Sequence, residues 1–301
     1  MPPQIIHFIT EDVIVIMSQP IESLNLLMLN VGFAEHNADW NWKNVSSPFI
    51  RIFYVVEGEA IVHFDDRSLS LTPGHLYIIP PYTRHSYECS GPLSLYYLHL
   101  YQAFKNERDI FEYYRFPDEV KAEPWIAAVF KLMCKQCPGA SLPESNPQVY
   151  DNGSSFRDYA QRYHQLPFYA KMRLRGDMLV LFSYFVENAE RLLPTGDERM
   201  LKVHNYINSN IDREIGVSQL SDMVYLAKPY FIRQFTSTFG VSPLKYITRK
   251  KMEKAQLLLL TSDLQVQEIA HLLSYNDHSY FVRQFRRTIG MAPNEYRQMM
   301  K

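Results

Sequence analysis

Two stretches near the C-terminus of the 301-residue chain are near-copies of each other, and this repeat constrains the fold more than any other feature. The segment PYFIRQFTSTFGVSPLKY (229–246) aligns with SYFVRQFRRTIGMAPNEY (279–296) at a spacing of 50 residues. Upstream, VSQLSDMV (217–224) pairs with VQEIAHLL (266–273) at a spacing of 49. Each copy therefore predicts a helix, a short turn and a second helix.

The second helix of each copy is amphipathic. Phenylalanines recur at every fourth position from Phe231 to Phe239, and the second copy repeats this apolar spacing, so these side chains face a core. Gly240 and Gly290 stand where each helix would end in a left-handed turn. The opposite face carries arginines, which suit bidentate contacts with guanine or phosphate. This is the layout of a helix-turn-helix, whose second helix enters the major groove of DNA.

The segment that joins the copies, PLKYITRKKMEKAQLLLL (243–260), predicts a basic amphipathic helix that packs both copies into one body. Two recognition helices held in this way would enter adjacent major grooves roughly 34 Å apart. The predicted DNA contacts are Lys228, Pro229, Ile232, Arg233, Thr236, Arg249, Lys250, His278, Ser279, Val282, Arg283, Arg286 and Arg287.

The charge distribution agrees with a polyanionic partner for this part of the chain. Residues 196–301 hold 15 Lys and Arg against 10 Asp and Glu, whereas residues 1–195 hold 16 against 22. A basic C-terminal third beside an acidic remainder indicates that the two parts have different functions, with a polyanion such as nucleic acid bound by the basic part. The alternative is an all-helical interaction module whose arginines are only solvated.

The region from about Met200 to Arg297 resembles the AraC/XylS family of bacterial transcription regulators. Its most specific portion is EIAHLLSYNDHSYFVRQFRRTIGMAPNEYR (268–297). Ser274-Tyr275 replaces the usual Gly-Phe, Ser221 replaces an Ala, and Pro229 opens the first recognition helix, where proline is tolerated. The resemblance implies a cytoplasmic, promoter-binding regulator, usually an activator that works with RNA polymerase.

The first half of the chain is rich in predicted strands. IRIFYVVEGEAIVHF (50–64) contains two β-rich runs around Glu57-Gly58, and SLSLTPGHLYIIPP (68–81) repeats the pattern around Pro73-Gly74. LSLYYLHLY (93–101) alternates, which places every second residue on one face. Short strands with Gly and Pro turns at this spacing favour an antiparallel sandwich or barrel.

This half resembles the cupin-like sensory domain that precedes the DNA-binding region in many members of the same family. The GEA turn, PGHLYIIPP and the following Thr-Arg-His carry the resemblance. It implies a small barrel that binds an effector, often a sugar, followed by helices that form a homodimer. Aromatic faces stack on sugar rings while polar side chains bind hydroxyls in a mostly apolar pocket, and our candidates are Trp42, Arg51, His85, Tyr87, Tyr97 and His99.

A cupin-type metal enzyme, or a sugar-binding protein with an added helical module, is the rival class. Cupin enzymes resemble one another in an HxH pair followed by Glu and a later His, because these ligands converge on one open metal site. No HxH occurs in this sequence, and Cys134-Lys-Gln-Cys137 is a lone CxxC pair. We therefore expect no metal, no cofactor and no catalytic residues. A regulator that has lost its ligand is a second rival.

The expected fold class is α+β, with a β-barrel domain and an all-α domain. The predicted boundaries are 1–195 for the effector and dimerisation domain, with a barrel over about 1–103 and helices over about 104–195, and 196–301 for the DNA-binding domain. Within the helical part, DEVKAEPWIAAVFKLMCKQC (118–137) and 171–193 predict helices, residues 138–155 predict a loop, and the linker begins at Pro194. The helix over 171–193 is the candidate dimerisation element, with covering the barrel as the alternative, and residues 138–170 have no assigned role.

The remaining features indicate a protein of a reducing compartment. The three cysteines are too few for a disulfide framework. The N-terminus MPPQIIHFITEDVIVI lacks the basic region of a signal peptide, and no run of about 18 uncharged apolar residues predicts a membrane span.

Overall fold

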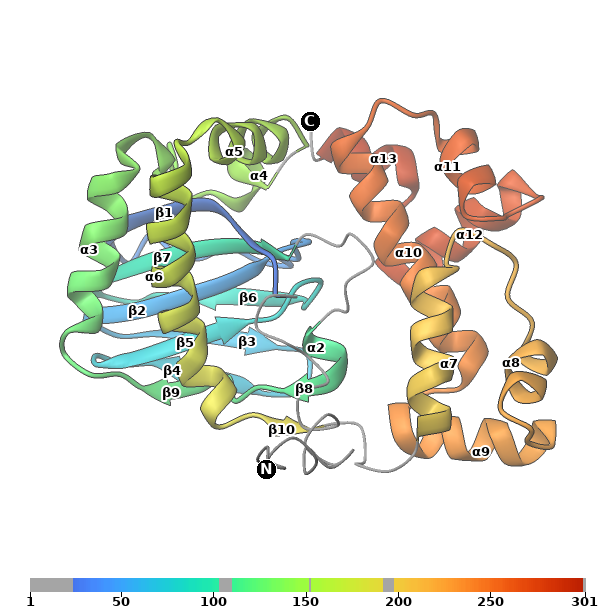
Figure 1. Ribbon diagram of the computed structural model, residues 1–301. Helices are drawn as coiled ribbons and strands as arrows, with labels where there is room; N and C mark the ends of the chain where they lie inside the picture. Colours follow the sequence, from blue (N-terminus) through green and yellow to red (C-terminus); the bar gives the residue numbers. More distant parts are fainter. Residues whose placement is uncertain (1–23, 103–109, 152, 192–197, 300–301) are drawn as a thin grey trace, which may run out of the picture.

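The computed structural model describes residues 24–102, 110–151, 153–191 and 198–299. The N-terminal half is built on antiparallel sheets of five and three strands (Figure 1). The order in the larger sheet is β1-β7-β2-β5-β9 and in the smaller sheet β4-β3-β6, and a short β10-β8 pair stands apart. The strands are β1 (Leu26–Asn37), β2 (Ile50–Gly58), β3 (Ala60–Phe64), β4 (Ser68–Leu71), β5 (His75–Ile79), β6 (His85–Glu88), β7 (Pro92–Gln102), β8 (Tyr114–Arg115), β9 (Glu119–Lys121) and β10 (Glu190–Arg191).

The five-stranded sheet has a hydrophobic core on each face, and the alternation of β7 shows how the sequence produces this. Leu95 and Tyr97 contribute to the core shared with the small sheet. Leu98 and Leu100, on the other face, contribute to a core covered by helices. Because both faces are buried, the central strands read as continuous apolar runs rather than as half-polar strands.

Two helices cover the outer face of the large sheet (Figure 1). They are α3 (Ile126–Gln136) and α6 (Phe168–Glu187), and α6 buries Leu174, Met178 and Phe182 in that core. The remaining helical pieces of this half are α2 (Ile110–Tyr113), the 3-10 turn η2 (Pro138–Ala140), α4 (Pro147–Tyr150) and α5 (Gly153–Gln165).

Three expectations for this half need correction. Residues 138–155 are not one loop: Pro138 opens η2, Pro147 opens α4 and Gly153 opens α5, and of the described residues between them only 141–146 and Asp151 lie outside helices. The helix expected over 118–137 begins only at Ile126, and residues 119–121 instead add β9 to the large sheet beyond the expected end of the barrel; Pro124 disfavours helical backbone before it. The helix expected over 171–193 starts after Pro167 and ends at Glu187.

Over its described residues the C-terminal half is helical, as the sequence predicts, and its two repeat units have separate cores. Its helices are α7 (Glu198–Ser209), α8 (Val217–Met223), α9 (Lys228–Phe239), α10 (Pro243–Thr261), α11 (Val266–Leu272), α12 (His278–Ile289) and α13 (Pro293–Met299). Helix α10 joins the units, giving Tyr246 and Ile247 to the first core and Met252 and Leu259 to the second.

The ends of the recognition helices follow the sequence signals. Gly240 and Gly290 adopt left-handed backbone, with φ of 72° and 94°. At the start of α12 the side chain of Asp277 accepts a hydrogen bond from the backbone N–H of Tyr280 at 3.0 Å, which caps the helix. The buried Lys251 joins the two units, since its Nζ donates to the carbonyl oxygens of Arg213 and Leu273.

The two halves touch through α10. Leu257 packs against a small cluster that includes Phe49, Tyr150 and Tyr159 of the first half. The hydroxyl of Tyr82 donates to the backbone oxygen of Glu253 at 3.3 Å. The predicted boundary at 195/196, most of the expected linker and the N-terminal segment lie outside the described residues. Within the described ranges, no helix has the length and apolar character that crossing a bilayer requires.

Candidate functional site

The polar faces of α9 and α12 point to solvent, as a DNA-reading surface requires. Arg233 and Arg283 occupy equivalent exposed positions, and each guanidinium lies over the ring of the tyrosine three residues earlier, at 5.2 and 6.0 Å. Arg286 and Arg287 are also exposed, whereas the matching positions of α9 carry Thr236 and Ser237. The second unit therefore presents the stronger positive charge.

The other predicted DNA contacts divide by exposure. Ile232 and Val282 are partly buried against their unit cores, and the hydroxyl of Thr236 donates to the backbone oxygen of Ile232. On α10, Lys250 is paired with Glu253 at 2.7 Å with only 14% of its side chain exposed, and Arg249 lies 3.7 Å from the same carboxylate. The remaining exposed candidates are Lys228, Pro229, His278 and Ser279.

The barrel contains a cavity of about 250 Å³. Aromatic and aliphatic side chains form much of its wall, among them Trp40, Phe53, Leu95 and Tyr97. Its polar lining residues are Glu35, His36, Asp39, His99, Glu144, Ser145 and Tyr150. A concave site that combines apolar walls with polar groups that can orient a ligand is the usual form of a small-molecule site.

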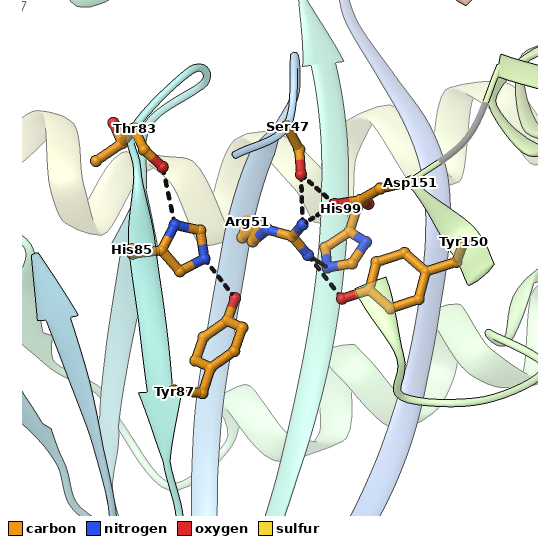
Figure 2. A network of polar contacts seen from close by, with 8 residues as sticks. All are labelled: Ser47, Arg51, Thr83, His85, Tyr87, His99, Tyr150 and Asp151. Atoms are coloured by element: carbon orange, nitrogen blue, oxygen red, sulfur yellow. Dashed lines mark hydrogen bonds and ion pairs between the residues drawn. The ribbon is translucent and has the colours of Figure 1, made fainter. Parts of the chain in front are cut away.

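A buried polar network borders this cavity and is centred on Arg51 of β2 (Figure 2). Its Nη2 lies 2.5 Å from a carboxylate oxygen of Asp151 and 2.5 Å from the hydroxyl of Ser47. Its Nη1 donates to the hydroxyl of Tyr150 at 2.9 Å and lies 3.1 Å from Nε2 of His99. The network thus ties two strands of the large sheet to the α4–α5 segment.

A second buried pair lies on β6. Nδ1 of His85 lies 2.8 Å from the backbone oxygen of Thr83, and its Nε2 lies 2.8 Å from the hydroxyl of Tyr87 (Figure 2). Burial, with the nearby charge of Arg51, lowers the pKa of His85 to about 3. The ring is therefore neutral at physiological pH, with its proton on Nδ1 and Nε2 accepting from Tyr87.

Burial governs the other titratable groups of this region. It lowers the pKa of His99 well below its ordinary value, and Arg51 adds to this effect. Burial raises the pKa of Asp151, which the guanidinium of Arg51 opposes. An ion pair of this kind holds only while both partners are present, because either charge alone would be buried without compensation.

The structure brings two of the six predicted effector residues to the cavity wall, Tyr97 and His99. Arg51 lies behind the wall and bonds to His99, while His85 and Tyr87 form their own buried pair. Trp42 is half-buried and lies outside the cavity lining. Sequence reasoning missed the contribution of Glu144, Tyr150 and Asp151, because they lie within the stretch 138–155 that the sequence predicts to be a loop.

The described residues contain no group of three His, Cys, Asp or Glu side chains arranged to hold a metal ion. Cys134 and Cys137 carry free thiols, and burial raises the pKa of each.

Comparison with known protein families finds a matching domain for each half of the chain. Residues 30–141 match the AraC-like ligand binding domain, and residues 220–299 match a helix-turn-helix domain. The chain belongs to the AraC/XylS family of transcription regulators. The resemblance drawn from the sequence and the expected α+β fold class are thereby confirmed.

Two proteins of known sequence and one solved structure show how much of the chain is similar to known proteins. A probable transcriptional regulator, LumQ of Photobacterium leiognathi, is 32% identical over 80 residues, 27% of this chain, but the match spans only 32% of LumQ. The transcriptional activator RhaS of Yersinia pestis is 22% identical over 254 residues, which is 82% of each chain. The crystal structure of ToxT from Vibrio cholerae is 14% identical, covers 92% of this chain and all of its own, and superposes with a TM-score of 0.54. This likeness shows that the chain shares its overall fold with ToxT.

Proposed function

We propose that this protein is a transcription regulator that binds promoter DNA in a sequence-specific manner and responds to a small molecule held in its barrel. The observation that carries the DNA-binding part is the pair of recognition helices with exposed Arg233 and Arg283 on matched faces. Arginines at such positions bind guanine edges and phosphates in the major groove. The exposed residues of α9 and α12 named above, with Arg249 and Lys250 of α10, are the proposed contact set.

The cavity supports the proposed effector function, and its wall shares a residue with the contact between the two halves. Tyr150 lines the cavity, bonds to Arg51 and belongs to the cluster that packs on Leu257 of α10. A molecule bound in the cavity would therefore contact Tyr150, which belongs to the cluster that packs against α10. An effector shifts the equilibrium between two arrangements only if it binds one of them more tightly.

The arrangement described here keeps α10 against the barrel. Lys250, a proposed phosphate contact, is largely covered and paired with Glu253, whose backbone oxygen receives the Tyr82 hydroxyl. Contact of Lys250 with DNA thus calls for a second arrangement in which α10 has moved from Tyr82. We propose activation, with RNA polymerase as a further partner and the cytoplasm as the place of action; the activator RhaS supports the direction of regulation.

We further propose a homodimer formed through α6. Its buried face covers the barrel, but Phe168, Tyr169 and Met172 at its start are between 60% and 77% exposed. Three large apolar side chains within about one helical turn form a patch of the kind that marks an interface.

The test begins with selection from a random duplex DNA library by the full chain. We expect an enriched motif with two half-sites about one helical turn apart. On that duplex, Arg283→Ala should weaken binding by about 1–3 kcal/mol, since a bidentate base contact is lost. Lys131→Ala, an exposed cation of α3, is the matched control and should leave the affinity unchanged. Failure to enrich any motif, or full affinity of the Arg283 variant, would refute the proposal.

A further inference from the structure

Apart from Phe33, the solvent-exposed residues of the cavity lining are acidic. Glu35, Asp39 and Glu144 are exposed lining residues, and no Lys or Arg occurs among the residues that line the cavity. Neither glutamate is paired with a basic side chain within the described ranges. Carboxylates gathered at a recess raise the local concentration of cations and repel anions.

The basic groups near these carboxylates do not cancel their charge. Asp39 accepts hydrogen bonds from the backbone of Asn37 and from Nδ1 of His36, at 2.9 and 3.2 Å. The first of these lowers the pKa of Asp39, while burial lowers the pKa of His36. At neutral pH the carboxylate is therefore charged and the imidazole is largely neutral. The buried guanidinium of Arg51, which bonds to His99, is already balanced by Asp151.

At the buried end of the cavity, His99 provides an independent sign of a ligand. A guanidinium only donates, so Nε2 of His99 accepts from Arg51 and the proton of the neutral ring lies on Nδ1. That Nδ1 is buried and has no hydrogen-bond partner among the described residues. The rings of Phe49, Tyr97 and Tyr150 flank the imidazole, and His99 is one of the residues that line the cavity.

A buried N–H without an acceptor is costly, so a ligand oxygen at this point would gain more than a hydrogen bond exposed to water. Arg51 is thus a positioning residue that sets the tautomer of His99 rather than a ligand contact. The acceptor that suits both a neutral N–H donor and an acidic recess is an uncharged hydroxyl oxygen, because a carboxylate ligand would be repelled by Glu35 and its neighbours.

We infer that the cavity binds a small organic cation that also carries a hydroxyl group, the hydroxyl meeting His99 and the cationic end facing Glu35, Asp39 and Glu144. This inference rests on the proposed effector function of the barrel. It selects hydroxylated amines, amino sugars among them, over neutral sugars and over carboxylates. ToxT structures, in contrast, have been solved with an unsaturated fatty acid bound.

The test uses thermal unfolding of the full chain with two sets of compounds matched in skeleton and differing in charge. One set is glucosamine, glucose and glucuronate, and the other is tyramine, 4-hydroxyphenethyl alcohol and 4-hydroxyphenylacetate. A ligand that binds only the folded state raises the melting temperature. We expect at least one of the two cations to raise it by several degrees, the neutral member of that set to raise it less and the anion not at all.

Variants assign the preference to the named residues. Glu35→Gln, Asp39→Asn and Glu144→Gln together should remove the advantage of the cation over the neutral compound. Glu57→Gln, Glu59→Gln and Asp65→Asn, equally exposed and outside the lining, change the net charge by the same amount and should preserve it. His99→Phe should abolish binding, whereas His99→Asn, whose amide N–H can take the place of Nδ1–H, should retain part of it.

The inference is overturned if neither cation raises the melting temperature, if an anion matches its cation, or if the control triple loses the preference as well. Binding of the selected duplex by the same preparations keeps this failure separate from failure of the proposed regulator. If the chain binds the selected duplex normally but shows no preference for the cations, only the inference that the cavity binds an organic cation is refuted.

Discussion

At the scale of single residues, buried polar groups are the most constrained part of the barrel. Arg51 is 1% exposed, and its charge is held by Asp151 with Ser47, Tyr150 and His99 around it. Removal of either charged partner would leave the other buried alone, at a cost of several kcal/mol. This network therefore specifies where the α4–α5 segment docks.

The buried neutral histidines predict a loss of stability in mild acid. The pKa of His85 is about 3 in the folded chain, against an ordinary value of 6.5, so below pH 6.5 the unfolded chain binds a proton that the folded chain does not. The free energy of unfolding should fall as the pH drops from 6.5 toward 3, by roughly 2 kcal/mol between pH 6.5 and 5 from this residue.

Urea unfolding at several pH values checks this expectation. In His85→Phe the free energy of unfolding should decline less than in the parent chain over pH 6.5 to 5. The reason is that unfolding of the variant is coupled to the uptake of about one proton fewer. Parallel declines for the two proteins would mean that His85 takes up its proton without unfolding.

The turns between the helices of each unit predict a stabilising substitution. Tyr225 and Ser274 occupy equivalent turns with left-handed backbone, at φ of 55° and 56°. Tyr225 is 94% exposed, so its side chain contributes little to packing. Tyr225→Gly should raise the free energy of unfolding by roughly 0.5–1 kcal/mol. This is the net of two effects: glycine relieves the backbone strain in the folded chain, but it also increases the conformational entropy of the unfolded chain, which offsets part of the gain.

Ser274→Gly is the matched control for that substitution. The hydroxyl of Ser274 donates to the backbone oxygen of Asp212 at 2.5 Å, so the gain in backbone freedom is offset by a lost hydrogen bond. Chemical denaturation of both variants measures the difference. Equal gains at the two sites would mean that the Ser274 hydrogen bond adds nothing to stability, and a loss of stability in Tyr225→Gly would contradict the predicted relief of backbone strain.

At the scale of elements, α6 has two apolar faces with different roles. One face supplies Leu174, Met178 and Leu181 to the core beneath the large sheet. The other leaves Phe168, Tyr169 and Met172 in solvent. The sequence alternatives of covering the barrel and forming a dimer are therefore compatible, because different residues of one helix serve each.

The proposed dimer gives a direct prediction. Phe168→Glu with Met172→Glu should convert the full chain from dimer to monomer at micromolar concentration, since two charges would be buried in the interface. Light scattering after size exclusion measures the mass. Leu132→Glu, an exposed apolar site on α3, should leave the dimer intact. A parent chain that is already monomeric would remove α6 from the mechanism.

At the scale of the whole molecule, the contact between α10 and the barrel decides which surfaces DNA can reach. Tyr82 and the cluster around Tyr150 hold the helix that carries Lys250 and joins the two units. The recognition arginines, in contrast, are exposed in this same arrangement. Regulation through this contact would act on the phosphate contacts and on the orientation of the units rather than on base-reading side chains.

Weakening that contact should favour DNA binding without ligand. Tyr82→Ala removes both the ring and the hydroxyl that reaches Glu253, and we expect a severalfold higher affinity for the selected duplex. Tyr82→Phe, which lacks only the hydroxyl, should have a smaller effect, since one such hydrogen bond contributes about 1 kcal/mol. Reduced affinity in both variants would mean that the docked arrangement is the one that binds DNA.

The sequence by itself determined the two helix-turn-helix units, their arginine faces and the strand-rich first half, because helix and strand periodicities are local properties of the chain. It also named Tyr97 and His99, which do line the cavity. The tertiary structure alone decided that Arg51 pairs with Asp151, that Lys250 is covered, and that Tyr150 and Tyr159 pack beside Leu257 of α10. Those outcomes depend on which distant segments share a buried space, and no local pattern encodes the partner that a buried charge will meet.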